Sequence, residues 1–512
     1  MKWFLLIFMA EIISNNKRIA KNTLFLYFRM ILIMGVTLYT SRVVLDKLGV
    51  DDYGLYTVVG GVVGMLSFLN ATLSSGTSRF LTFELGTGNK ERLTKTFSTA
   101  FYTHLLLSVI IVAVMETVGI WFFYNKLVIP PDRLIACFWV LQFSILTTVI
   151  AILQVPYTAT IMAHEYMDIY AYISIFETIA KLFVCYLLIV VDFDRLVFYA
   201  ALLTFVQFIT SILYVYSCFR NFAESKLRLI FDKQILHTMI NFSGWNIIAN
   251  ITETLKLQGV IILLNIFFTP AIITAQSIAN QVSTAIMAFV NNFRLAINPQ
   301  IIKLYASGDK DASKRLTLST TAYCFDLVLL LGLPALFVMD ELLHLWLVEV
   351  PDYAVIFSQW MIVCQIVGTF NAAFYIPMMA ANKIKKNSMA AVYFGIGQFV
   401  VLYFLLKLGC GVMWVQYLQL FMMIGFSLVV KPYILYKEIN YSFKELFVCY
   451  WACAKVLLLS LAISIPICYN LNHDLIGSIL KVLIVGSSVL LSSYIFLDKG
   501  TKQKLLVFLK RK

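Results

Sequence analysis

The sequence predicts an all-α membrane protein that crosses the bilayer many times. Of its 512 residues, 61% are hydrophobic and only 13% are charged, and the mean hydropathy is +0.86. Apolar segments near twenty residues in length recur about every 36 residues. This spacing fits membrane helices, which need about 20 residues, and not barrel strands, which alternate polar and apolar residues over about ten positions. No connection is long enough for a soluble domain.

We expect about fourteen membrane helices: two six-helix lobes related by a pseudo-two-fold axis along the membrane normal, and two C-terminal helices. The spans are centred on 24–46, 54–78, 97–123, 134–158, 169–191, 196–218, 241–268, 271–296, 317–339, 353–379, 387–407, 411–435, 446–469 and 475–497. The expected domains are a cytoplasmic N-terminal segment (1–22), an N-lobe (23–218), a cytoplasmic linker (219–240), a C-lobe (241–435), the last two spans (436–497) and a basic cytoplasmic tail (498–512). The apolar run Trp3–Ala10 is followed by Glu11 without a cleavage site, so we interpret it as an interfacial segment and not as a signal peptide.

A net charge of +13 can indicate either nucleic acid binding or membrane topology, and the distribution of the charge decides between them. With the N-terminus inside, the inner connections hold 29 of the 40 lysines and arginines, Lys431 among them. The outer connections hold five, which are Lys47, Lys126, Arg133, Arg195 and Lys407. This is the bias of the positive-inside rule. We therefore expect both termini in the cytoplasm and no nucleic acid partner.

The span 241–268 is apolar enough to cross a bilayer, yet it carries Glu253 and Lys256 near its middle. A central charge costs roughly 2.5–3.5 kcal/mol on insertion scales, so such residues normally face a bundle interior or a water-filled cavity. Asn246, Asn250 and Glu253 are spaced at i, i+4 and i+7, which places them on one stripe of a helix. We expect this stripe to face a lumen where the two lobes meet.

The first span carries two arginines, Arg29 and Arg42, towards its opposite ends. Either arginine could line a lumen, or it could extend to the membrane interface as an anchor. The sequence leaves both interpretations open.

Acidic residues in other spans are candidates for ion coupling or polar lining. Glu177 and Lys181 are four residues apart, so they can neutralise each other on one helix face or form a proton or sodium site. Glu116 lies in the third span. Asp326 is a lone carboxylate in the ninth span, which makes it a candidate for ion coupling.

Two halves of the chain repeat one pattern. At an offset of 220 residues, the turn that holds Gly88, Lys90, Glu91 and Lys95 is matched by Gly308, Lys310, Asp311 and Arg315, and at 221 Pro156 is matched by Pro377. The order of spans agrees on both sides. Because six is an even number, two six-helix copies have the same orientation in the membrane.

Several stretches together resemble a known family of exporters. They are 22–42, the stretch Leu48-Gly49-Val50-Asp51-Asp52-Tyr53-Gly54-Leu55-Tyr56, the turn Gly88-Asn89-Lys90 and its echo Gly308-Asp309-Lys310. The chain resembles polysaccharide biosynthesis exporters of the O-antigen flippase (Wzx) type, within the multidrug/oligosaccharidyl-lipid/polysaccharide exporter superfamily. The resemblance extends over essentially the whole chain.

The resemblance implies a carrier in the bacterial inner membrane, and not an enzyme. Such a carrier moves undecaprenyl-pyrophosphate-linked oligosaccharide from the cytoplasmic to the periplasmic leaflet by alternating access, for O-antigen, capsule or lipopolysaccharide synthesis. It implies membrane lipids as partners, with a glycan polymerase and glycosyltransferases nearby. Family members have a cationic central cavity, and arginines bind pyrophosphate oxygens bidentately. The residues that we expect to do this are Arg29, Arg42, Arg79, Lys256 and Arg294.

Two other functions remain to be weighed. A multidrug or small-cation antiporter of the same superfamily would need uncompensated acids in the lumen, and the basic residues disfavour cationic cargo. An integral-membrane O-antigen polymerase or ligase would need a large outer loop, but the longest here, near 340–352, has about a dozen residues. No HExxH or Gly-x-Ser-x-Gly motif occurs. The nine cysteines are dispersed without a CxxC pair, so we expect no metal site and no cofactor.

Overall fold

The computed structural model describes residues 17–496 except 165, 191–193, 227, 229, 382 and 473, and this part of the chain is all-α with no strand. Ten of its helices are long and apolar enough to cross a membrane. The other four expected spans lie on α2 (Lys17–Gly64), α3 (Ser67–Thr87), α9–α10 (Lys233–Thr254 and Val260–Phe267) and α11 (Pro270–Ala306). These four are among the helices through which the two lobes contact each other, so their polar side chains have protein neighbours.

The first lobe consists of the helices from α2 to α8. After α2 and α3 it contains α4 (Lys90–Val114), the π-helix η1 (Met115–Gly119), α5 (Ile120–Lys126), η2 (Pro131–Arg133), α6 (Leu134–Ala163), α7 (Met167–Val190) and α8 (Arg195–Asn221). The short helix η3 (Ala223–Ser225) then leads to α9. Helix α6 packs against α8, α3, α4 and α2, so it is the central helix of this lobe.

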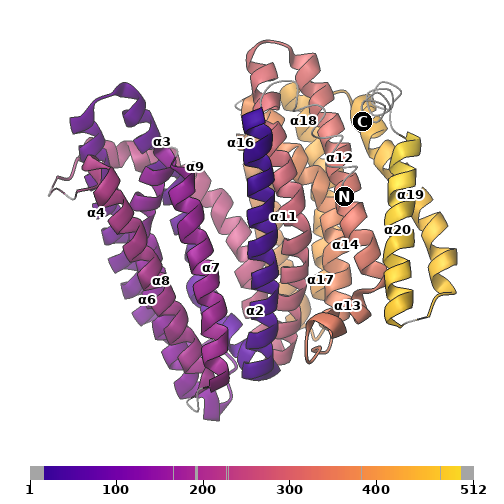
Figure 1. The fold of residues 1–512 in the computed structure, drawn as a ribbon, viewed down its shortest axis with the longest axis horizontal. Coiled ribbons are helices and arrows are strands. Elements are labelled where there is room, and N and C mark those ends of the chain that lie inside the picture. The colour runs from indigo at the N-terminus through magenta and orange to yellow at the C-terminus, as the bar shows by residue number, and fades with distance from the viewer. Residues whose placement is uncertain are drawn as a thin grey trace.

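The second lobe begins at α9 and ends at α18. It contains α9, the π-helix η4 (Leu255–Gly259), α10, α11, α12 (Lys310–Phe337), α13 (Met339–Trp346), α14 (Ala354–Ala373), α15 (Tyr375–Ala380), α16 (Lys385–Lys407), α17 (Trp414–Ile424), the π-helix η5 (Gly425–Val430) and α18 (Lys431–Ile439). Two added helices, α19 (Phe443–Tyr469) and α20 (Leu475–Phe496), pack on each other and on α12. They form the edge of the bundle in yellow in Figure 1.

The repeated turn has the same geometry in both lobes. Gly88 and Gly308 each adopt a positive φ, 72° and 88°. The side chain of the next residue caps the N-terminus of the following helix. Asn89 accepts a hydrogen bond from the Arg92 amide and Asp309 accepts one from the Ala312 amide, each at 3.0 Å. A left-handed glycine followed by an Asx N-cap is a compact way to end one helix and start the next. The sequence repeat is therefore a repeat of backbone structure.

The bend in α2 joins the two lobes. Gly49 has φ 80° and ψ 169°, so the helix turns there and continues to Gly64. Just past the bend, Gly54 lies against the start of α11, and a Cβ on Gly54 would be 2.2 Å from the Pro270 carbonyl oxygen. The hydroxyl of Thr274 donates to the Val50 carbonyl at 2.7 Å. The two glycines of the stretch 48–56 thus have different structural roles: Gly49 allows the bend in α2, and Gly54 allows the close approach of α2 to α11.

Two ends of the bundle can be distinguished. We call the end with the α3–α4 and α11–α12 turns the Gly88 end, and the end with the α2 bend the Asp52 end. Figure 1 shows α3 to α8, in purple and magenta, leaning away from the second lobe at the Gly88 end and converging with it at the Asp52 end, whereas α2, in indigo, stands beside α11. Two of the described helices cross this division: α2 packs on α11, and α9 contacts α3 and α4 as well as α16.

Replacing Gly54 with Ala should weaken the joint between the lobes. The new methyl group would collide with backbone, which cannot move aside as a side chain can, and overpacking of this kind costs about 1–3 kcal/mol. We expect a lower Tm for Gly54→Ala in detergent. The matched control is Gly60→Ala in the same helix, where a Cβ meets nothing within 4 Å. An unchanged Tm for Gly54→Ala would contradict the contact.

Candidate functional site

A polar cavity of about 200 Å³ lies inside the second lobe, and we call it the amide cavity. Its wall is made by η4, α11, α14, α16, α17 and η5, together with the end of α9 and the start of α10. Six side-chain amides are the common feature of the lining, and they belong to Gln276, Asn280, Gln365, Asn371, Gln398 and Gln419. Amides present both donors and acceptors, so such a cavity can solvate a polar group of either sign.

Glu253 and Lys256 both line the amide cavity, which lies inside the second lobe and not where the lobes meet, and Asn250 of the expected stripe does not line it. The Lys256 ammonium donates to the Glu253 carboxylate at 3.0 Å. Glu253 remains mostly exposed, whereas Lys256 is half-buried. Lys256 lies in the π-helix η4, and Gly395 of α16 lets this segment approach closely, because a Cβ there would be 2.1 Å from the Thr252 methyl group.

Arg294 lies behind the same cavity, on α11. One guanidinium nitrogen donates to the Ala372 carbonyl and another donates to Asn291 Oδ1 at 3.4 Å. Its Nε is buried and has no partner in the part of the chain that the structure describes. Ala372 directly follows Asn371, a lining residue, so Arg294 adds positive charge next to the cavity.

Lys431 is a residue of this site that the charge pattern missed. The topology assigned it to an inner connection, but it is the first residue of α18 and is 0% exposed. Its ammonium donates to Asn371 Oδ1 at 3.0 Å and to Asn387 Oδ1 at 2.6 Å. Arg294 and Lys256 are the charged groups that act on it. Near the end of an apolar span, hydropathy does not distinguish a buried lysine from one in the following connection. The only indication in the sequence is that Lys431 directly follows the apolar run 425–430.

A second cavity of about 490 Å³ adjoins the first, between α2 and α11. Its α2 wall is largely apolar and includes Met30, Ile33, Met34 and Leu38. Asn280 lines both cavities, so the apolar space and the amide cavity meet at this residue. An elongated ligand with a polar and an apolar end could therefore extend across the lobe interface.

The remaining predicted site residues lie elsewhere. The side chains of Arg29 and Asn246 are outside the described part, and Asn250 is half-buried on α9. Arg42 is exposed and donates to the Leu345 carbonyl of α13 at 3.1 Å, across the lobe interface. Arg79 is exposed, with its guanidinium 6.0 Å from the Phe80 ring centroid.

The predicted acids occupy three separate places. Glu116 is exposed on η1. Glu177 accepts from Lys181 at 2.6 Å, so the self-neutralising pair forms on α7. Asp326 lines a cavity of about 320 Å³ between α12, α19 and α20, which Glu445 also lines. No group of three or more His, Cys, Asp or Glu that could hold a metal occurs among the residues searched, which are those that the structure describes.

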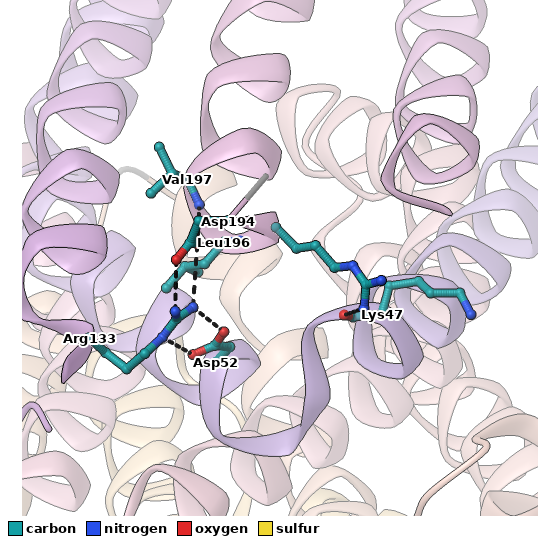
Figure 2. A network of polar contacts seen from close by, with 7 residues as sticks. Lys47, Asp52, Arg133, Asp194, Leu196 and Val197 are labelled. Carbon is teal, nitrogen blue, oxygen red and sulfur yellow. Dashed lines mark hydrogen bonds and ion pairs between the residues drawn. The ribbon is translucent and has the colours of Figure 1, made fainter. Parts of the chain in front are cut away.

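An ion network closes the first lobe at the Asp52 end (Figure 2). Arg133 of η2 donates to both Asp52 carboxylate oxygens, and to Asp194 Oδ2 at 2.7 Å. Asp194 also accepts from the Leu196 and Val197 amides and so caps α8. Burial raises the pKa of Asp52 above its ordinary value, although Arg133 acts to lower it. One arginine thereby holds α2, α6 and α8 together.

Comparison with solved structures shows the same fold in known transporters. The lipid II flippase MurJ in an inward closed conformation matches with a TM-score of 0.67 and 11% identity, over 91% of this chain and 98% of that one. An inward-facing multidrug resistance MATE family transporter of the MOP superfamily matches with a TM-score of 0.63 and 12% identity, over 79% and 94%. An outward-facing multidrug resistance MATE family transporter of the same superfamily matches with a TM-score of 0.56 and 13% identity, over 80% and 93%.

These matches define the class by fold: the chain is a polytopic membrane protein with the fold of MOP superfamily transporters. No protein-family model matches the sequence, and no curated protein matches it. The MurJ match includes nearly the whole of both chains, whereas the two MATE matches cover about four fifths of this one.

Removing the arginine of the ion network should destabilise the first lobe. In Arg133→Met the half-buried Asp52 loses its bidentate partner, which we expect to cost about 1–3 kcal/mol. The control is Arg195→Met, which loses one hydrogen bond of 3.3 Å to the Lys47 carbonyl at an exposed site. Equal Tm values for the two variants would argue against the network as a structural clamp.

Proposed function

We propose that this protein is a flippase that moves undecaprenyl-pyrophosphate-linked oligosaccharide from the cytoplasmic to the periplasmic leaflet of the bacterial inner membrane by alternating access. In this proposal the Gly88 end and both termini face the cytoplasm, and the product feeds the synthesis of O-antigen, capsule or a related surface glycan. The amide cavity receives the pyrophosphate and first sugars. The polyprenyl chain remains in lipid.

The observation that carries the proposal is the excess of positive charge inside the second lobe. Lys256, Arg294 and Lys431 lie in or directly behind the amide cavity, and Glu253 is the one carboxylate among its described lining residues. Each isolated charge in hydrocarbon costs several kcal/mol, so a net positive interior is stabilised when it binds an anion. A pyrophosphate supplies that charge and accepts several hydrogen bonds.

The shape of the site supports a lipid-linked cargo. The amide cavity meets a mostly apolar cavity at Asn280, on the surface that α2 and α11 share. The amide cavity suits a polar head group, and the apolar cavity suits the first part of an apolar tail. The fold gives further support, because one structure that shares it over most of the chain is a lipid II flippase.

In the same proposal, other predicted basic residues act along the path of the cargo. Arg42 lies at the α2–α13 contact and Arg79 near the Gly88 end of α3, where they would meet the anion after and before the cavity. Arg29 belongs to the same first span. Asp326, Glu116 and the Glu177–Lys181 pair remain candidates for ion coupling, with Asn246 and Asn250 as polar lining.

A multidrug antiporter is the second candidate, because MATE transporters share the fold. The charge around the amide cavity disfavours cationic drugs, since Lys256 and Arg294 would repel them. The cavity with Asp326 and Glu445, which has no Lys or Arg in its described lining, is the feature that favours this alternative. A polymerase or ligase is disfavoured by the transporter fold.

The direct test measures binding of a polyprenyl pyrophosphate to the purified protein. In Lys256→Ala and Arg294→Ala we expect the affinity to fall about 10- to 100-fold, which corresponds to the loss of one charge-assisted hydrogen bond. Lys407→Ala is the matched control, because Lys407 is exposed at the end of α16 and outside the cavity. Equal affinity in all variants would exclude the cavity as the pyrophosphate site.

The cellular test compares strains that lack the gene and carry each variant. Loss of surface glycan, with lipid-linked intermediate accumulating in the inner membrane, is the result expected for the deletion and for the two cavity variants at normal expression. Intact glycan together with greater sensitivity to cationic drugs would identify the protein as a drug exporter instead.

A further inference from the structure

Lys431 is an unusual residue because it is fully buried and has no acidic partner among the described residues. Its relative exposure is 0%. No carboxylate in the part of the chain that the structure describes forms an ion pair with it. Lysine is almost never fully buried unless it is paired, since removing an ammonium ion from water is expensive. Other groups around Lys431 must therefore replace its hydration.

A cage of four groups surrounds the ammonium. Asn387 Oδ1 accepts a hydrogen bond at 2.6 Å and Asn371 Oδ1 accepts one at 3.0 Å. The rings of Phe426 and Tyr375 lie with their centroids 5.6 Å and 5.8 Å from Nζ. The four groups come from α16, α14, η5 and α15, so the cage connects elements that are far apart along α14 to α18.

The chemistry of this cage is that of a cation site. Amide oxygens are ligands of alkali and alkaline-earth ions, and the faces of aromatic rings attract cations. We propose that Lys431 is a built-in cation, whose ammonium permanently occupies a site in the second lobe that would otherwise bind a monovalent metal ion such as Na⁺ or K⁺. This proposal concerns how the lobe is held together and does not depend on the identity of the cargo.

Two consequences follow from a cation that is covalently attached. The site cannot be emptied by a change in ion concentration, so the packing of α14, α16 and α18 is independent of sodium. The cage also touches the amide cavity, because Asn371 and Phe426 line that cavity and contact Lys431 at the same time. The charged groups that act on Lys431 are Arg294 and Lys256, which are both basic and give no compensation.

Lys431→Met is the first test, because methionine keeps the side-chain length as far as Cε, with sulfur in place of Cδ, and lacks the ammonium. The purified wild-type protein and the variant are unfolded thermally in sodium, potassium or choline chloride at equal ionic strength. The wild type should have the same Tm in all three salts. The variant should have a lower Tm in choline and a saturable rise of about 2 °C or more in sodium or potassium.

Two controls accompany this experiment. Lys431→Met combined with Asn387→Leu removes one oxygen of the cage, and the rise with sodium or potassium should disappear. Lys256→Met removes a different ammonium from the same lobe, and no ion-specific rise should appear. A sodium-specific rise in the wild type, or a folded Lys431→Met variant with one Tm in all three salts, would overturn the proposal.

Asn387→Asp provides a second test of whether Lys431 acts as a built-in cation. This test still applies if Lys431→Met does not fold in any salt. A carboxylate of the same shape would pair with a charged ammonium, so a built-in cation predicts a Tm equal to or above that of the wild type. If Lys431 carried no charge, the new buried carboxylate would be unpaired and the Tm would fall by several degrees. Such a fall would contradict the proposal.

Discussion

The cost of placing a charge in hydrocarbon is the constraint on which the second lobe depends. The lobe contains more basic than acidic groups in its interior, and each basic group is stabilised differently. Lys256 pairs with Glu253 on the wall of a polar cavity. Lys431 is held by two asparagine oxygens. Arg294 donates to a backbone carbonyl of α14. The amides, the π-helices and the close helix approach at Gly395 all serve this arrangement.

The contact between α2 and α11 connects this polar interior to the first lobe. Besides the backbone approach at Gly54, Gln281 of α11 donates to the Tyr53 hydroxyl at 2.8 Å. At the same end, Trp346 donates to the Leu38 carbonyl and Asn265 exchanges two hydrogen bonds with the backbone of Val128. Specific polar contacts between the lobes are therefore concentrated towards the Asp52 end. A carrier that opens alternately on its two sides must break these contacts in turn.

The fold could be predicted from sequence more completely than the site. Hydropathy is sufficient to predict an all-α membrane protein. The repeat can also be recognised in the sequence, because both of its turns, at 88–89 and 308–309, pair a glycine with an Asn or Asp that caps the next helix. The pairing of Glu177 with Lys181 also follows from spacing alone. Lys431 could not be found in this way, because its burial depends on Asn371 and Asn387, which come from two other helices. Arg42 likewise reaches α13, more than 300 residues away in sequence.

The repeat does not extend to the basic residues around the amide cavity, and this difference says where specificity resides. Subtracting the offset of 220 from Lys256, Arg294 and Lys431 gives positions 36, 74 and 211, which are Val36, Ser74 and Ser211. None of the three can carry charge. A two-fold scaffold is suited to rocking of one lobe against the other, which needs matched shapes. Recognition of an anion needs matched charge, and the basic groups described in or directly behind the amide cavity all belong to the second lobe. Under the proposed function, the cargo head group binds in the second lobe, and the apolar wall of α2 in the first lobe is the surface past which the rest of the cargo moves.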